Sequence, residues 1–333
     1  MADTFKFRID HHGSLVRPPE LLAARAANSP DLREIEDAAI AEAVRKQRKL
    51  SLTVVTDGEF RRADLRSAVF DAVHGFRRAE DERWVAEGEL KAYRSLVSED
   101  VAAVAALTQI PAKATLPSPA YLAAQTYQPG GPWASARELG EALAQLVRDE
   151  IEAIIARGVR LIQLNNHGYA EHLSGASYGA LSFEDAIAVD SIAVSVADKP
   201  FNVRIGLCPA TSATGDVDVA AAERLFASVP VDRWILPYDT GAPAETELLR
   251  VVPAERDVCL GIVSPSTPEL EDVDTVMTRL DVVGSIRDLE DVAISPSAGF
   301  SDVAGRNAIG VEDQWRKLTH VETFARMCWG NEL

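Results

Sequence analysis

The chain has 333 residues, of which 47% are hydrophobic and 26% charged, and its formal net charge is -17. This composition is typical of a globular protein with a large core and argues against intrinsic disorder. The strong negative charge disfavours a broad basic surface, so nucleic acid is not an expected partner.

The cysteine content argues against disulfides and against a thiolate zinc knuckle. Cys208, Cys259 and Cys328 are far apart, odd in number, and form no Cys-x-x-Cys pair. The first residues lack the apolar segment of a secretory signal, and no stretch is long and apolar enough to span a bilayer. We therefore expect a protein of the reducing cytoplasm with no membrane partner.

Short β-rich runs recur along the chain, and each one breaks into a polar segment before a helical pattern begins. In chain order the eight runs cover residues 5–14, 50–60, 110–119, 158–168, 201–210, 232–241, 257–265 and 291–300. Ala- and Leu-rich stretches with helical spacing lie between them, at 32–50, 135–158 and 266–280. The last stretch opens with Ser, Thr, Pro and Glu, which predicts a helix start at 266–269.

Strands that alternate with helices and are apolar on both faces predict parallel pairing with helical crossovers. Eight such units is the number that closes a barrel, so we expect an α/β fold with one (β/α)8 TIM-type barrel domain over residues 1–333. An open doubly wound sheet is the alternative, but no Gly-x-Gly-x-x-Gly motif follows any of the runs. The segment at about 76–108 is expected to be a helical insertion on the barrel rim.

In such barrels the chemistry takes place at the carboxyl ends of the strands, so the residues where each run breaks are the candidates. Those residues are His11, His12, Ser14, Asp57, Glu59, Ser118, Asn165, Asn166, His167, Arg204, Cys208, Tyr238, Asp239, Ser264, Ser297 and Ser301. Catalytic roles are predicted for His11, His12, Glu59, His167 and Asp239. Substrate-binding roles are predicted for Ser14, Asn165, Arg204, Cys208 and Tyr238. No metal ligand and no cofactor is predicted.

The motif RIDHHGSLVRP places two histidines side by side in a chain that has six. Adjacent residues of a strand point to opposite faces, so at most one of His11 and His12 enters the barrel mouth. His167, at the end of the fourth run, is suited to act as a general acid or base near neutral pH. The alternatives are structural hydrogen bonds for His11 and His12 and a solvent-exposed loop position for His167.

Charged and thiol side chains at other strand ends also have two interpretations. A guanidinium inside a barrel is unfavourable without a partner, so we expect Arg204 to bind a substrate carboxylate. The alternative for Arg204 is a structural ion pair with Glu59 or Asp239. Cys208 is either a nucleophile or a packed core residue, and Asp57 is expected to cap a helix or anchor a loop.

Seven segments resemble, in the same order and over nearly the whole chain, the C-terminal catalytic barrel of cobalamin-independent methionine synthase and its short single-barrel relatives. They are RIDHHGSLVRPPELLAAR, VVTDGEFRR, LPSPAYL, LIQLNNHGYA, LPYDTG, LGIVSPSTPELEDVDTVMTRL and SPSAGFSDVAGRNAIGVEDQWRKLTHVETFA. The resemblance implies a barrel and, in the family, a zinc ion held by His, two Cys and Glu. That zinc activates a homocysteine thiol for methyl transfer from a folate.

The resemblance also marks where this chain departs from the family. The family's His-x-Cys on the fifth strand corresponds here to Gly206 and Cys208 in one register and to Arg204 and Gly206 in the other. Its sixth- and eighth-strand ligand positions hold Pro237 and Ala298. Because at most one ligand of four remains, we expect the zinc site to be lost.

The part of the family site that holds the substrate amino acid is half retained. Ser14 and Glu59 match the family pattern, whereas Asn165 stands where the family has Asp and His167 where it has Pro. One carboxylate facing a substrate ammonium is therefore absent, which predicts a change of substrate.

We expect an enzyme that acts without zinc on a small anionic molecule by histidine and carboxylate acid–base chemistry, of lyase, hydratase or transferase type. A thiol methyl or alkyl transferase of the family type is one alternative, and a non-catalytic small-molecule-binding protein is another. The expected partner is the small-molecule substrate, and assembly into a homo-oligomer is left open.

Overall fold

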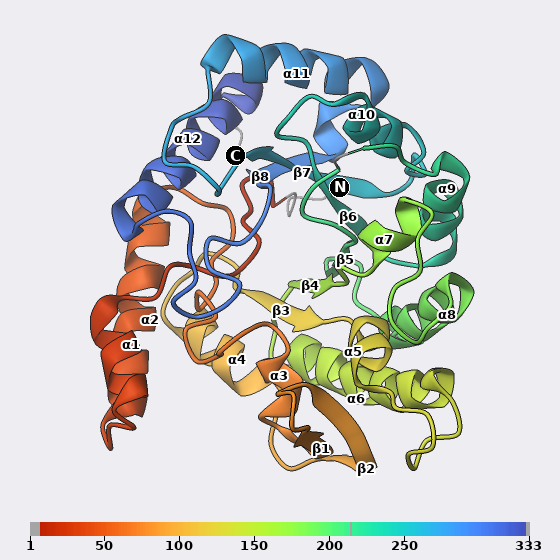
Figure 1. Ribbon diagram of the computed structural model, residues 1–333. Coiled ribbons are helices and arrows are strands. Elements are labelled where there is room, and N and C mark those ends of the chain that lie inside the picture. The colour runs from red at the N-terminus through yellow and green to blue at the C-terminus, as the bar shows by residue number, and fades with distance from the viewer. Residues whose placement is uncertain (1–6, 214, 331–333) are drawn as a thin grey trace.

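The computed structural model describes residues 7–213 and 215–330, and a six-stranded parallel sheet lies at its centre (Figure 1). The strands follow one another in chain order: β3 (Lys113–Pro117), β4 (Leu161–Asn165), β5 (Arg204–Cys208), β6 (Arg233–Pro237), β7 (Asp257–Val263) and β8 (Val292–Pro296). Every neighbouring pair is parallel, so all six carboxyl ends lie at the same edge.

Two short segments, at residues 8–10 and 53–55, span the space between β8 and β3. The first exchanges two backbone hydrogen bonds with Ile294 of β8, at 2.8 and 2.9 Å. The second exchanges two with the start of β3, at 2.8 and 3.0 Å, and the Thr53 amide donates to the Ile9 carbonyl at 3.2 Å. The segments take the places of the first two strands, and the fold is the predicted (β/α)8-type barrel.

Helices cover the outside of the sheet (Figure 1). They are α1 (Pro19–Ala26), α2 (Leu32–Lys49), α3 (Ser67–Phe70), α4 (Ser98–Ala106), α5 (Pro119–Thr126), α6 (Ala136–Ala156), α7 (Tyr169–Leu173), α8 (Phe183–Val194), α9 (Val219–Ser228), α10 (Pro243–Arg250), α11 (Val273–Ile286) and α12 (Val311–Trp329), with a 3-10 turn at Leu289–Asp291. The longest, α6, begins where the Ser135 hydroxyl accepts the Glu138 amide, and it buries one apolar stripe. Among the described residues, no helix is long and apolar enough to cross a membrane.

The segment predicted as a helical insertion is largely not helical. It contains an antiparallel hairpin, β1 (Val73–Arg78) and β2 (Trp84–Ala92), and only α4 at its end is a helix. The hairpin is held by aromatic packing, since the Phe70 ring lies 4.7 Å from Trp84 and 4.9 Å from Phe76. In Figure 1 it projects beside α5 and α6. Phe70 lies outside the segment predicted as an insertion, so the composition of that segment did not reveal this packing.

The predicted start of α11 at 266–269 is also wrong, because the helix begins at Val273. Asp272 is its N-cap, and its carboxylate accepts the Thr275 amide at 2.9 Å. The preceding residue, Glu271, pairs with the fully buried Lys317 of α12 at 2.8 Å. This ion pair holds the preceding stretch as a loop against α12.

Candidate functional site

A narrow pocket opens at the carboxyl ends of the strands, and its cavity volume is about 20 Å³. Its lining residues are His12, Ser14, Glu59, Leu65, Asn165, His167, Thr211, Gly299 and Asp302. Five of them, His12, Ser14, Glu59, Asn165 and His167, are sequence-predicted site residues. They come from loops that are far apart in the chain, and the barrel brings them together.

Glu59 is a buried carboxyl on one wall of the pocket. Its Oε1 accepts the Thr115 hydroxyl at 2.7 Å and lies 3.7 Å from an Arg62 nitrogen. Burial raises the pKa of Glu59, and the charges and hydrogen bond around it only partly offset that effect. The Asp57 carboxylate accepts the Glu59 amide at 2.9 Å, the loop-anchoring role expected for Asp57. The burial of Glu59 therefore favours its protonated form.

His12 is a neutral base buried in the pocket wall. Burial, and then the positive charge of Lys113, lower its pKa to about 3, while the nearby Asp10 carboxylate acts in the opposite direction. Lys113 and Asp10 form an ion pair at 2.7 Å inside the barrel. An imidazole kept neutral in this way can accept a hydrogen bond or a proton from a bound molecule.

His11 points to the other side of the backbone, away from the pocket. Its Nε2 bonds to Oε1 of Gln47 on α2 at 2.9 Å, and burial lowers its pKa to about 4. The alternation of side chains along an extended segment therefore gives the two neighbouring histidines different environments. The predicted catalytic role of His11 is wrong, and the structural alternative accounts for it.

His167 and Asp302 lie on the pocket wall together with Ser14. Burial lowers the pKa of His167, while the negative charge of Asp302 acts to raise it. The Ser14 hydroxyl donates to Oδ1 of Asp302 at 2.9 Å. Asp302 was not predicted, although it directly follows Ser301 where the eighth run breaks. Sequence reasoning also missed Thr211, which lies in the loop after the fifth run.

The two asparagines after β4 have different roles. Asn165 faces the pocket and its Oδ1 accepts the Gln163 amide at 2.7 Å. Asn166 instead donates to the buried carboxylate of Asp190 on α8 at 2.9 Å, and the Ser118 hydroxyl donates to the same carboxylate at 2.6 Å. Asn166 and Ser118 thus support the loops around the pocket and do not line it.

Arg204 does not lie at the pocket. It is the first residue of β5, at the amino end of the strand, whereas Cys208 is the last. The four intervening steps place the two residues about 13 Å apart along the strand. The Arg204 side chain pairs with Asp257 at 3.2 Å and donates to the Phe201 carbonyl at 2.9 Å. The predicted substrate-binding role is wrong, and the alternative of a structural ion pair is correct with a different partner.

Cys208 lies in an apolar cluster with Ile235, Cys259 and Ala293 inside the barrel. Its thiol donates to the Ala210 carbonyl at 3.2 Å, and burial raises its pKa to about 12. A thiol so strongly held in its neutral form is a poor nucleophile. No cluster of three or more His, Cys, Asp or Glu side chains suited to a metal occurs within 7–213 and 215–330. The donor set does not fit the family's zinc, and the predicted substrate-binding role of Cys208 is wrong.

The remaining predicted residues lie outside the pocket. The buried Tyr238 has its hydroxyl 3.3 Å from that of a threonine on α10, and the Asp239 carboxylate accepts the Ser297 hydroxyl at 2.7 Å. Neither Tyr238 nor Asp239 lines the pocket, so the structure does not bring them to the predicted site. Ser264 and Ser301 form hydrogen bonds within the loops that follow β7 and β8.

A buried arginine outside the predicted set holds the pocket loops in place. Arg17 donates to the carbonyls of Glu59 at 2.8 Å and Arg62 at 3.1 Å, and also to the carbonyl of Ser301. One guanidinium therefore joins the loop that carries Glu59 to the loop that carries Asp302. Its five donors in a fixed plane suit this role better than an ammonium would.

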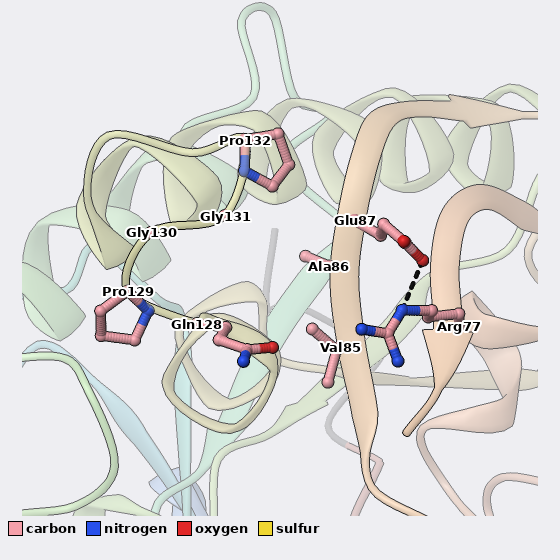
Figure 2. Close-up of a pocket in the computed structure, with 9 residues that line it drawn as sticks. All are labelled: Arg77, Val85, Ala86, Glu87, Gln128, Pro129, Gly130, Gly131 and Pro132. Atoms are coloured by element: carbon pink, nitrogen blue, oxygen red, sulfur yellow. Dashed lines mark ion pairs between the residues drawn. The ribbon is translucent and has the colours of Figure 1, made fainter. Parts of the chain in front are cut away.

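A second hollow lies outside the barrel, between the β1–β2 hairpin and the loop at 128–132. Figure 2 shows the ion pair of Arg77 and Glu87 on its hairpin side, at 2.5 Å, and the Pro- and Gly-rich loop on the other. Its lining contains no histidine or cysteine, and its two charged residues pair with each other. The chemistry is therefore better placed at the carboxyl ends of the strands.

Comparisons with known proteins agree with this architecture. A family model described as the catalytic domain of cobalamin-independent synthase matches residues 20–313. The uncharacterized proteins YxjG and YxjH of Bacillus subtilis are 28% and 26% identical to the chain, over 97% of it and 95% of each relative.

Solved structures show the same fold. One from Listeria monocytogenes, described as a proposed vitamin-B12-independent methionine synthase, has a TM-score of 0.80 and 26% identity over 98% of both chains. A B12-independent methionine synthase from a Shewanella species, solved with selenomethionine, has a TM-score of 0.75 and 16% identity over 97% of both chains. The chain therefore belongs to the family of cobalamin-independent synthase catalytic domains.

Proposed function

We propose that the chain is an enzyme that transforms a small polar molecule by proton transfer in the pocket, without the thiol-activating zinc of its family. His12 and His167 are the proposed proton acceptors, and Glu59 is the proposed donor. One observation carries the proposal: the pocket gathers these three groups, while Cys208, the one family ligand position that still holds a ligand-type residue, lies in an apolar cluster away from them.

The environments of the three groups support this division of roles. Burial lowers the pKa of both histidines and raises that of Glu59, so it favours the unprotonated form of each imidazole and the protonated form of the carboxyl. Titratable groups that burial shifts in opposite senses are the usual basis for an acid and a base in one site. Lyase, hydratase and transferase reactions all fit such a pair.

The expectation of an anionic substrate loses its main support. It was based on Arg204, which lies at the other end of the strand, and no lysine or arginine is among the described residues that line the pocket. Asp302 and Glu59 are the carboxyl groups there. We therefore propose a substrate that is small and polar but carries no net negative charge at the pocket.

Methyl or alkyl transfer to a thiol is the second candidate, because membership of a methionine-synthase-related family favours it. It differs from the first in needing a thiol, a methyl donor and, in the family pattern, zinc. The third candidate is a binding protein without catalysis, which would be stabilised by a ligand that it does not convert.

The test is a conversion screen with purified protein from which metal has been removed by a chelator. A panel of thioethers and amino acids, of hydroxy acids as anionic comparison compounds, and of thiols paired with methyl donors is followed by mass spectrometry. We expect conversion by the metal-free chain, a loss of at least about 100-fold in His167→Gln, and little loss in His172→Gln. His172 is a matched control because it lies on α7, outside the pocket.

Other outcomes decide between the candidates. Conversion that requires zinc, a thiol and a methyl donor together would contradict the proposal and establish the transferase. A rise in melting temperature with one panel member, without conversion, would favour the binding protein.

A further inference from the structure

We infer that Asp302 is a positioning residue for His167, and that Ser14 orients its carboxylate, so that the pocket has a base side at His167 and an acid side at Glu59. The inference rests on the proposed function and adds a residue that neither the sequence motifs nor the family assigns. It follows from contacts on the two sides of the HHGS loop.

On the base side, hydrogen bonds join the loop after β8 to the HHGS loop. The Ser14 hydroxyl donates to Oδ1 of Asp302 at 2.9 Å, and the Phe300 amide donates to the Ser14 carbonyl at 3.1 Å. Because the Ser14 hydroxyl proton is directed to this carboxylate, Ser14 orients Asp302 and is not free to act as a nucleophile.

Two glycines make room for the two carboxyl groups. A Cβ on Gly299 would lie 2.0 Å from the Ser14 hydroxyl oxygen and 2.2 Å from Oδ1 of Asp302. A Cβ on Gly13, whose φ is +130°, would lie 2.9 Å from Oε1 of Glu59. Any larger residue would displace the carboxyl group on its side, so the close approach on each side depends on glycine.

The two carboxyl groups have unlike surroundings. Glu59 is only 3% exposed and its oxygen accepts the Thr115 hydroxyl, whereas Asp302 is exposed at the mouth of the pocket. Burial disfavours the charged form of Glu59, whereas the carboxyl group of Asp302 is in contact with water. This contrast places the proton donor at Glu59 and the fixed negative charge beside His167.

Asp302, His12 and Glu59 line the pocket together with His167, and the centroid of the Tyr121 ring is 5.9 Å from that of the imidazole. Burial disfavours the charged forms of His12 and Glu59, so Asp302 supplies the charge that stabilises a protonated His167. Burial opposes that protonated form, and the carboxylate of Asp302 counteracts burial.

The proton transfers balance without any further reactant. His167 accepts a proton from the bound molecule and becomes an imidazolium beside Asp302. Glu59 gives its carboxyl proton to the same molecule and becomes a carboxylate. Exchange with water after release returns one proton to Glu59 and removes one from His167, so no electron donor or acceptor is needed.

The test is an NMR titration of the histidine rings in the full chain, with the His167 signal assigned by its absence in His167→Gln. We expect Asp302→Asn to lower the apparent pKa of His167 by about one unit, which is tenfold in proton affinity, and Asp302→Glu to restore most of it. Asp274→Asn is the control, because Asp274 is a carboxylate on α11 outside the pocket. An unchanged His167 titration in Asp302→Asn would overturn the inference.

A second measurement separates the inference from the proposed function. For any compound that the chain converts, Asp302→Asn should reduce the rate about tenfold with rescue by Asp302→Glu, at an unchanged melting temperature. A shifted titration in a chain that converts nothing would retain the Asp302–His167 pair and reject the enzyme. Conversion that is indifferent to Asp302→Asn would retain the enzyme and overturn the inference.

Discussion

At the residue scale, identical side chains acquire opposite roles from the direction in which the backbone points them. His12 lines the pocket, whereas its neighbour His11 bonds to Gln47 behind the strand. Likewise Asn165 faces the pocket and Asn166 bonds to Asp190 on α8. The chemical type of a residue at a strand end is therefore necessary for a site, but the face on which it lies decides whether it contributes.

The buried histidines predict a loss of stability in mild acid. Both pKa values are lowered, to about 4 for His11 and about 3 for His12. Below pH 6.5 these two imidazoles are therefore protonated in the unfolded chain but still unprotonated in the folded chain. The free energy of unfolding should fall as pH drops toward 4, by about 1.4 kcal/mol per pH unit for each histidine. Urea unfolding at several pH values measures the slope. His12→Gln should flatten it, and an equal slope in wild type and variant would contradict this account.

At the scale of elements, the loops around the pocket depend on buried polar groups that join them. Asp190 of α8 accepts the Ser118 hydroxyl at 2.6 Å, the Ala120 amide at 3.1 Å and the Asn166 side chain at 2.9 Å. One carboxylate thus connects α8, the start of α5 and the loop after β4. Arg17 connects the loops of Glu59 and Asp302 in the same way from the opposite side.

Removing this connection should destabilise the protein strongly. Asp190→Ala leaves three buried donors without an acceptor, and we expect the free energy of unfolding to fall by about 3 kcal/mol. Urea unfolding provides the measurement. Asp149→Ala is the matched control, because the exposed Asp149 of α6 only accepts the Gln145 side chain at 2.6 Å. A loss below about 1 kcal/mol in Asp190→Ala would show that the connection is unimportant.

At the scale of the whole molecule, the barrel is joined at a seam without regular strands. Six strands form a continuous sheet, and the segments at 8–10 and 53–55 complete the ring with few bonds. The Thr53 hydroxyl strengthens this seam, since it accepts the Ile9 amide at 2.8 Å and donates to the Ile9 carbonyl at 2.9 Å. The seam carries the HHGS loop on one side and the Glu59 loop on the other, so it fixes both walls of the pocket.

The hydrogen bonds of Thr53 at the seam predict that removing one hydroxyl group will lower the stability of the protein measurably. Thr53→Val keeps the shape of the side chain but removes both hydroxyl bonds, and we expect it to lower the free energy of unfolding by about 2 kcal/mol. Chemical denaturation measures the change. Thr278→Val is the control, because the Thr278 hydroxyl only bonds to a carbonyl on the exposed face of α11. Equal losses in the two variants would argue against a special role for the seam.

Much of this protein is determined by its sequence. The eight alternating units predicted the barrel, because hydrophobic period and length are local properties that survive folding. Motif order predicted the family, and the strand-end rule selected His12, Glu59 and His167, which line the pocket. Their catalytic roles stay predictions. The expected loss of the zinc site rests on residue identity at the family's ligand positions, and it stays a prediction.

The tertiary structure alone decided what depends on direction, distance and surroundings. It directs His11 toward Gln47 on α2, places Arg204 at the amino end of β5, and encloses Cys208 in an apolar cluster. It also brought Asp302 beside Ser14, 288 positions away in the chain. Strand register and barrel closure set these relations, and burial then sets the charge of each group. None of the three is a property of a short stretch of sequence, because each arises only when distant segments pack together.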